Sequence, residues 1–81
     1  MLYSVYVIKS KRDDSLYIGL STDIKKRLSN HNQGLSKYTK GHLPYRPVFI
    51  SFFPDKFTAA NFEKYLKTAS GKAFINKRLI K

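Results

Sequence analysis

The sequence predicts a small α+β domain in which helices pack against a three-stranded, largely antiparallel sheet. Its 81 residues are the length of one domain, so residues 1–81 are expected to form a single unit. Apolar segments follow the order strand, strand, helix, strand, helix, helix, which is typical of this class. With 42% hydrophobic residues the chain can form a core of its own.

The first two strands are expected to form an antiparallel hairpin. Residues 3–9 are rich in Tyr, Val and Ile, which favour strands, and residues 16–20 are a second segment of this kind. The polar connection between them is short enough for a hairpin turn. Two strands that carry tyrosines are therefore predicted to lie side by side.

A helix is expected over about residues 23–32. Asp23 supplies a side chain suited to capping its first turn. Ile24 and Leu28 are four residues apart and predict a buried stripe, and Gly34 is expected to end the helix.

The second half of the chain predicts one strand and two helices. The strand is expected at residues 48–53, and a helix capped by Thr58 at about residues 58–68. Ser70 and Gly71 are expected to break this helix, after which a short basic helix closes the chain.

Charge is the strongest compositional signal. Sixteen Lys and Arg against five Asp and Glu leave a formal net charge of +11. A domain this small and basic attracts polyanions, most often nucleic acid and less often an anionic membrane surface. Solubility alone requires a much smaller imbalance.

The absence of cysteine and of long apolar segments excludes several classes of protein. Disulfides and cysteine-rich zinc sites are excluded, which fits a reducing compartment. No apolar segment is long enough to cross a membrane, and the first ten residues lack the features of a signal peptide. A cytoplasmic protein is expected, and no obligate protein partner is evident.

The candidate nucleic-acid contacts lie in an irregular segment at residues 33–47, named here the basic loop, and near the C-terminus. Long loops inside compact domains are usually functional. Cations bind phosphates, and tyrosines between them can stack on unpaired bases. The terminal cations also suit a solvated helix end. The candidate contacts are Lys37, Tyr38, Lys40, Tyr45, Arg46, Lys77 and Arg78.

Glu63 is the only glutamate of the chain and is the best candidate for a metal ligand. A hard cation such as Mg²⁺ can be held by one carboxylate together with water and phosphate oxygens. The alternative is a surface glutamate that pairs with Lys67 four residues later.

Arg27 and His31 are four residues apart on the predicted helix and therefore project in the same direction. A guanidinium can bind phosphate with two parallel hydrogen bonds, and an imidazole can act as a base or a phosphate contact. The alternative for His31 is a favourable interaction with the helix dipole.

Taken together, these segments resemble the GIY-YIG nuclease superfamily, above all its small stand-alone bacterial members. The resemblance covers essentially the whole chain with the segments in the family's order. The matching segments are Ser4-Val5-Tyr6, YIG at 17–19, RLSNHNQG at 27–34, SKYTKGHLPYRP at 36–47, EKYLK at 63–67 and SG at 70–71.

The resemblance implies the GIY-YIG fold and phosphodiester hydrolysis with a single divalent ion, Mg²⁺ or Mn²⁺. Glu63 would hold the metal, and Arg27 would bind and polarise the scissile phosphate. His31 would orient water or contact phosphate. Tyr6 and Tyr17 match the two motif tyrosines, one of which is expected to orient the attacking water or accept its proton.

Tyr17 is the preferred base, because Gly19 leaves room beside it and Arg27 follows at the family's usual interval. A phenol with a pKa of about 10 is a weak base at neutral pH, so positive surroundings and a metal-bound water would have to assist it. Asn76, in the last helix, is a candidate for supporting the site, at only roughly the family's spacing from Glu63.

The sequence therefore predicts a metal-dependent nuclease that acts on DNA rather than RNA, in repair, recombination or turnover. Departures from the family's motifs, which include Ser51-Phe52-Phe53 where members often end the third strand with a glutamate, leave a second hypothesis open. Ser4 stands in a first motif that lacks its glycine, and Leu20 stands where excision-repair members carry a lysine. The second hypothesis is a nucleic-acid-binding module with the same fold and little hydrolysis, and the third is a small basic RNA-binding protein.

Overall fold

The computed structural model describes residues 1–35 and 39–79, with side chains as far as residue 78. The candidate contacts Lys37 and Tyr38 lie outside the described residues. The order of strands and helices confirms the predicted α+β class. The elements are β1 (Tyr3–Ser10), β2 (Leu16–Ser21), α1 (Ile24–Asn32), a 3₁₀ turn (Lys40–His42), β3 (Tyr45–Phe53), α2 (Lys56–Leu66), α3 (Ala69–Phe74) and a π-helical turn (Ile75–Leu79).

The three strands form one antiparallel sheet in the order β2-β1-β3. The predicted hairpin of β1 and β2 is confirmed, with Tyr6 opposite Gly19 and Ile8 opposite Tyr17. Strand β3 pairs with the other side of β1, and its register shifts where Ile8 faces Pro47. Proline is tolerated here because β3 is an edge strand.

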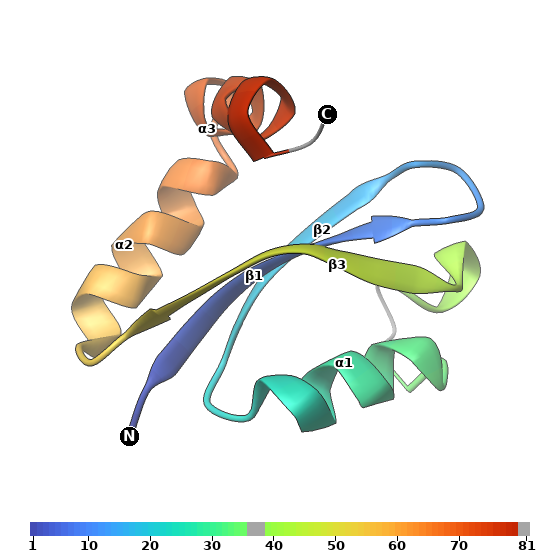
Figure 1. The fold of residues 1–81 in the computed structure, drawn as a ribbon, viewed down its shortest axis with the longest axis horizontal. Coiled ribbons are helices and arrows are strands. Elements are labelled where there is room, and N and C mark those ends of the chain that lie inside the picture. Colours follow the sequence, from blue (N-terminus) through green and yellow to red (C-terminus); the bar gives the residue numbers. More distant parts are fainter. Residues whose placement is uncertain (36–38, 80–81) are drawn as a thin grey trace.

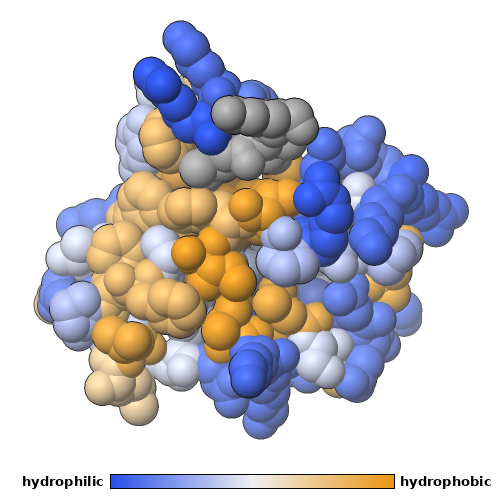
Figure 2. All heavy atoms as spheres, viewed as in Figure 1, coloured by the Kyte–Doolittle hydropathy of each residue, from blue (hydrophilic) through white to orange (hydrophobic). Residues whose placement is uncertain are grey.

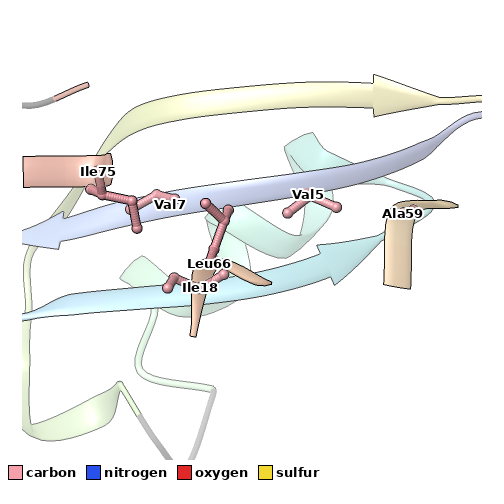
Figure 3. Packing of buried hydrophobic residues seen from close by; sticks show 6 residues of the cluster. All are labelled: Val5, Val7, Ile18, Ala59, Leu66 and Ile75. Atoms are coloured by element: carbon pink, nitrogen blue, oxygen red, sulfur yellow. The ribbon is translucent and has the colours of Figure 1, made fainter. Parts of the chain in front are cut away.

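The two faces of the sheet are covered by different helices (Figure 1). Helix α1 lies on one face, and helices α2 and α3 lie on the other. Because side chains alternate along a strand, neighbouring residues of β1 enter two separate cores. Figure 3 shows the core on the α2 side, which consists of Val5, Val7, Ile18, Ala59, Leu66 and Ile75.

The core on the α1 side is built around aromatic residues. Tyr6, Ile8 and Tyr45 are buried there, and the partly buried Ile24 and Leu28 pack against them. The predicted apolar stripe of α1 is therefore confirmed. This core holds the residues on which the candidate site is built.

Helix α1 begins and ends as its sequence predicts. The Asp23 carboxylate accepts a hydrogen bond from the backbone N–H of Lys26 at 3.2 Å, which caps the first turn. Gly34, with φ of 75°, follows the last turn, and its N–H donates to the carbonyl of His31 at 3.1 Å. A left-handed residue at this place is most often glycine.

Two boundaries differ from the sequence prediction. Strand β3 begins at Tyr45 rather than at residue 48, because Tyr45 pairs with Ser10 on β1. Helix α2 is capped by Asp55 rather than by Thr58. The Asp55 carboxylate accepts hydrogen bonds from the backbone N–H and the hydroxyl of Thr58 at 2.8 and 2.9 Å, so Thr58 lies inside the first turn.

The break between α2 and α3 also lies elsewhere than predicted. Helix α2 ends before Lys67, and the Thr68 side chain caps α3 by accepting from the N–H of Gly71 at 3.1 Å. Gly71 therefore lies within α3, where a Cβ atom would stand 2.5 Å from the Cα of Leu66. The glycine allows the two helices to pack closely instead of separating them.

Apolar side chains also reach the surface. Figure 2 shows them across the middle and left of one face, with hydrophilic residues along its right side. Within the described part of the chain, no helix has the length and apolar character needed to cross a membrane. The large exposed apolar side chains are Met1, Leu2, Leu35, Phe52, Phe57 and Tyr65.

Gly19 is the closest point of contact between β2 and the Tyr6 side chain. A Cβ atom at Gly19 would lie 2.5 Å from Cζ and 2.9 Å from Cε1 of Tyr6. The space that Gly19 leaves is therefore filled by the ring of Tyr6, and not kept open beside Tyr17 as the sequence suggested. Gly19 therefore allows the Tyr6 ring to approach β2 closely.

We expect Gly19→Ala to destabilise the fold by about 1–3 kcal/mol, because the added methyl group overpacks against the buried Tyr6 ring. The free energy of unfolding in urea measures this effect. Gly41→Ala is the matched control, since a Cβ atom there has no other atom within 4 Å. Equal stabilities of the two variants would contradict the close approach of Tyr6.

Candidate active site

Four of the five predicted catalytic side chains come together on the α1 face of the sheet. Tyr6 extends from β1, Tyr17 from β2, and Arg27 and His31 from α1. The ring of Tyr17 packs on that of His31 with centroids 4.9 Å apart, and the rings of Tyr6 and Tyr17 are 6.3 Å apart. The predicted i,i+4 relation of Arg27 and His31 places both beside the tyrosines.

A chain of hydrogen bonds connects these groups. The Tyr6 hydroxyl lies 2.9 Å from Nε2 of His31, and Nε of Arg27 donates to the same hydroxyl at 3.4 Å. Nδ1 of His31 lies 2.8 Å from Oγ1 of Thr39, a residue of the basic loop. Both ring nitrogens of His31 are therefore engaged with protein groups.

Burial divides the site into two layers. Tyr6, His31 and Thr39 are fully buried, with an exposed fraction of 0% each. Arg27 and Tyr17 are half-buried and remain accessible from solvent. In this arrangement a substrate phosphate can contact Arg27 and Tyr17 but not His31, which the sequence had offered as a phosphate contact.

The electrostatics of the buried layer favour neutral forms. Burial raises the pKa of Tyr6, although the hydrogen bond from Arg27 opposes this shift, so the phenol stays protonated. Burial lowers the pKa of His31, and the charge of Arg27 lowers it further, so the imidazole is neutral at pH 7. The hydrogen bond to Tyr6 raises the pKa of Arg27, which keeps its positive charge.

Glu63 lies apart from these four residues, on helix α2 at the other face of the sheet. Its side chain is 22% exposed, and its carboxylate pairs with Nζ of Lys67 at 3.2 Å, as the alternative hypothesis expected. The carboxylate nevertheless acts on the site through its charge. Its charge is among the causes that raise the pKa of Tyr6, after burial and the neighbouring Tyr17.

The acidic groups suit at most a sparsely liganded cation. In residues 1–35 and 39–79, no three His, Cys, Asp or Glu side chains are grouped as metal ligands. A hard cation that keeps most of its waters needs only one or two carboxylates from the protein. The half-exposed Glu63 fits this requirement, and its metal role stays a prediction.

The candidate nucleic-acid contacts differ in exposure. Tyr45 is buried with an exposed fraction of 6%, and its ring lies 6.3 Å from that of His31, so it belongs to the core and does not offer a face to bases. Asn76 is exposed on the π-helical turn. Among the candidates that the structure describes, the exposed cations are Lys40, Arg46, Lys77 and Arg78.

Two residues of the site were not singled out by the sequence. Thr39 bonds His31, and the Asn32 side chain clamps the backbone of Tyr45. Oδ1 of Asn32 accepts from the Tyr45 N–H at 2.8 Å, and Nδ2 donates to the Tyr45 carbonyl at 3.2 Å. The sequence indicated Asn32 only through its position directly after His31. Thr39 lies in the matching segment at 36–47, but nothing in that segment pointed to His31, because only the fold brings the two residues together.

Comparisons with known proteins agree with the geometry. A family model described as the GIY-YIG catalytic domain matches residues 2–78. A UPF0213 protein from Clostridium perfringens is 42% identical over 64 residues, which cover 78% of this chain and 68% of that protein. A UPF0213 protein from Bacillus licheniformis is 40% identical over 68 residues, which cover 83% and 70% of the two chains.

A solved structure has the same fold. The solution NMR structure of a UPF0213 protein from Bacillus halodurans aligns with a TM-score of 0.61 at 32% identity. The alignment covers 98% of this chain and 87% of that one. The three-stranded antiparallel sheet with its helices is therefore shared with this bacterial protein.

We expect stability to fall as the pH decreases below about 6.5, the ordinary pKa of histidine. The pKa of His31 is lower in the folded than in the unfolded chain, so the unfolded chain takes up a proton first. The contribution of neutral His31 is fully present above that pH and is lost as the pH falls through the folded pKa. Urea unfolding at a series of pH values measures it.

His31→Gln should flatten this pH dependence, whereas His42→Gln should retain it. His42 is the matched control because it is only half-buried and lies outside the site, beside Asp13. An unchanged pH dependence in the His31→Gln variant would mean that His31 is not held neutral.

Proposed function

The chain belongs to the GIY-YIG family, as its motifs predicted, and we propose that it is a divalent-metal-dependent nuclease acting on DNA. Hydrolysis of nucleic acid is the activity of the family. The observation that carries the proposal for this chain is the position of Arg27. Its charged side chain is accessible, is oriented by the buried Tyr6, and lies beside Tyr17.

Arg27 is suited to bind the scissile phosphate. Its Nε donates to the Tyr6 hydroxyl, and its two terminal nitrogens, beside Tyr17, are the donors that can bind a phosphate. A guanidinium held in this way can donate two parallel hydrogen bonds to phosphate oxygens. Because it is positioned before the substrate arrives, it can stabilise the charge that develops in the transition state.

Tyr17 is the group that we assign to the attacking water. It is the accessible tyrosine of the site, whereas Tyr6 is buried and kept protonated. In the proposed step Tyr17, as the phenolate, takes a proton from water while the water oxygen bonds to phosphorus. The bond from phosphorus to one ester oxygen breaks, and that oxygen takes up a proton from solvent.

Glu63 is the residue that would hold the metal ion, Mg²⁺ or Mn²⁺. When bound, such an ion neutralises phosphate charge and makes a coordinated water more acidic. The charge of Glu63 reaches the Tyr6 hydroxyl, which supports a location near the phosphate bound by Arg27. A lone carboxylate in a domain of net charge +11 otherwise weakens the attraction of nucleic acid.

The substrate is proposed to be held through its backbone rather than through its base sequence. The exposed cations Lys40, Arg46, Lys77 and Arg78 offer phosphate contacts. Binding by such contacts should weaken steeply with salt, because each one releases counterions. We therefore propose recognition of DNA by shape, in repair, recombination or turnover, in the cytoplasm.

A second candidate function is binding without hydrolysis. The observation that favours it is the Glu63–Lys67 ion pair at 3.2 Å, on the face of the sheet opposite to α1. If that pair is not replaced by a metal ion, the site keeps its phosphate contacts and lacks the cation. The chain would then bind nucleic acid and leave it intact.

We expect Glu63→Gln to abolish Mg²⁺- or Mn²⁺-dependent cleavage of labelled DNA while its affinity for DNA stays equal or rises slightly. The amide keeps the size of the side chain and removes the charge that recruits the metal. Cleavage on a panel of single-stranded, nicked and flapped DNA, with matching RNA, measures the first effect. Binding at several salt concentrations measures the second.

Asp14→Asn is the control with the same change in charge, at an exposed turn. It should leave cleavage unchanged. Cleavage that persists in the Glu63→Gln variant would remove the metal role of Glu63. Binding without cleavage by the unaltered protein, over the whole panel, would favour the second candidate function.

Measurements of stability and of turnover should distinguish the roles of the two motif tyrosines. Tyr6→Phe should cost about 1–3 kcal/mol, because Nε2 of the buried His31 loses its partner. Tyr17→Phe should change stability little and lower kcat by roughly a hundredfold or more, as expected for loss of a general base. A Tyr17→Phe variant with full turnover would contradict the assignment of the base.

A further inference from the structure

Thr39 is a buried polar residue of the basic loop. Its exposed fraction is 0%, while the next residue, Lys40, is exposed. A buried hydroxyl is costly unless it is hydrogen-bonded, and the bond at 2.8 Å to Nδ1 of His31 satisfies this one. The basic loop is thereby attached to the buried layer of the site.

The groups around His31 decide which of its nitrogens carries the proton. Among the described residues, side chains from several different elements lie near His31. These are Tyr6 of β1, Tyr17 of β2, Tyr45 of β3, Arg27 of α1 and Thr39 of the basic loop. None of them is a carboxylate, so nothing in this set favours a charged imidazole.

The direction of each bond follows from the donors. Arg27 has only donors, so the Tyr6 oxygen accepts from it. The phenol hydrogen is confined near the ring plane and is the more acidic hydroxyl hydrogen, so it is directed to Nε2 of His31. A neutral imidazole has one donor and one acceptor, which leaves Nδ1–H to donate to Thr39.

We infer that Thr39 is a positioning residue whose hydroxyl accepts from Nδ1–H and, together with the Tyr6 hydroxyl at Nε2, holds His31 as its Nδ1–H tautomer, so that His31 and Tyr6 in turn orient the guanidinium of Arg27. The inference deepens the proposed function, on which its catalytic meaning rests. Thr39 touches neither substrate nor reacting atoms. It acts through His31 and Tyr6 on Arg27, which is proposed to bind the phosphate.

The position of Thr39 couples the basic loop to the catalytic centre. Lys40, adjacent to it, is a proposed phosphate contact, and the Ser10 hydroxyl donates to the carbonyl of His42 two residues further on. The 3₁₀ turn is therefore fixed at both ends, to His31 and to β1. The basic loop and the orientation of Arg27 therefore share one buried anchor, the hydrogen bond between Thr39 and His31.

The test uses Thr39→Val, which keeps the shape of the side chain and removes the hydroxyl, and Thr39→Ser, which keeps the hydroxyl. Thr22→Val, at an exposed threonine, is the matched control. The first readout is the ¹⁵N chemical shifts of the His31 ring nitrogens in the protein without substrate. This readout needs no nuclease activity.

The unaltered protein, Thr39→Ser and Thr22→Val should show a protonated Nδ1 and an unprotonated Nε2. Thr39→Val should lose this preference and show a mixture or the Nε2–H form. An Nε2–H tautomer in the unaltered protein would overturn the inference even if Thr39→Val fails to fold. An unchanged tautomer in Thr39→Val would overturn it as well.

The second readout is DNA cleavage. Thr39→Val should lower kcat by about 10- to 100-fold with little change in KM, because a phosphate bound by a misaligned guanidinium is poorly placed for attack. Thr39→Ser should restore turnover. Equal turnover of all variants would overturn the link from Thr39 to Arg27. Absence of cleavage by the unaltered protein would instead overturn the proposed function, and the tautomer of His31 would then be tested by the chemical shifts alone.

Discussion

The Tyr6 hydroxyl is the point on which the site depends. It is fully buried, it bonds His31 of α1, and it receives a hydrogen bond from Arg27 one turn earlier on the same helix. The cost of burying this hydroxyl is offset only while both partners are present. The hydroxyl therefore fixes how α1 sits on the sheet, and it fixes the direction of Arg27 at the same time.

The two hydrogen bonds of the Tyr6 hydroxyl join two layers of the site that have different functions. The inner layer of Tyr6, His31 and Thr39 has no exposed surface and is held in neutral forms by burial. The outer layer of Tyr17 and Arg27 is open to solvent. A rigid inner layer favours the proposed role of Arg27, because groups already oriented need no rearrangement when charge develops on a phosphate.

Glu63 lies on α2, in the helix layer on the opposite face of the sheet from α1. Its distance from the others along the chain and across the sheet means that charge, and not a direct bond, connects it to Tyr6. Its ion pair with Lys67 is half-exposed, and such pairs contribute little to stability, so it can be exchanged for a metal ion at small cost. In the second candidate function this ion pair stays intact, and the domain binds nucleic acid without cutting it.

Local patterns in the sequence determined the class of fold, the hairpin, the capped helix α1 and the family. Each depends on residues close together in the chain, such as Asp23 at its cap or Arg27 and His31 one turn apart. Tertiary structure alone decided the long-range choices. Pairing with Ser10 extends β3 to Tyr45, whose side chain is buried in the core. The Tyr6 ring fills the space at Gly19. Thr39 forms its hydrogen bond with His31. These contacts depend on packing between distant segments, which no short window of sequence contains.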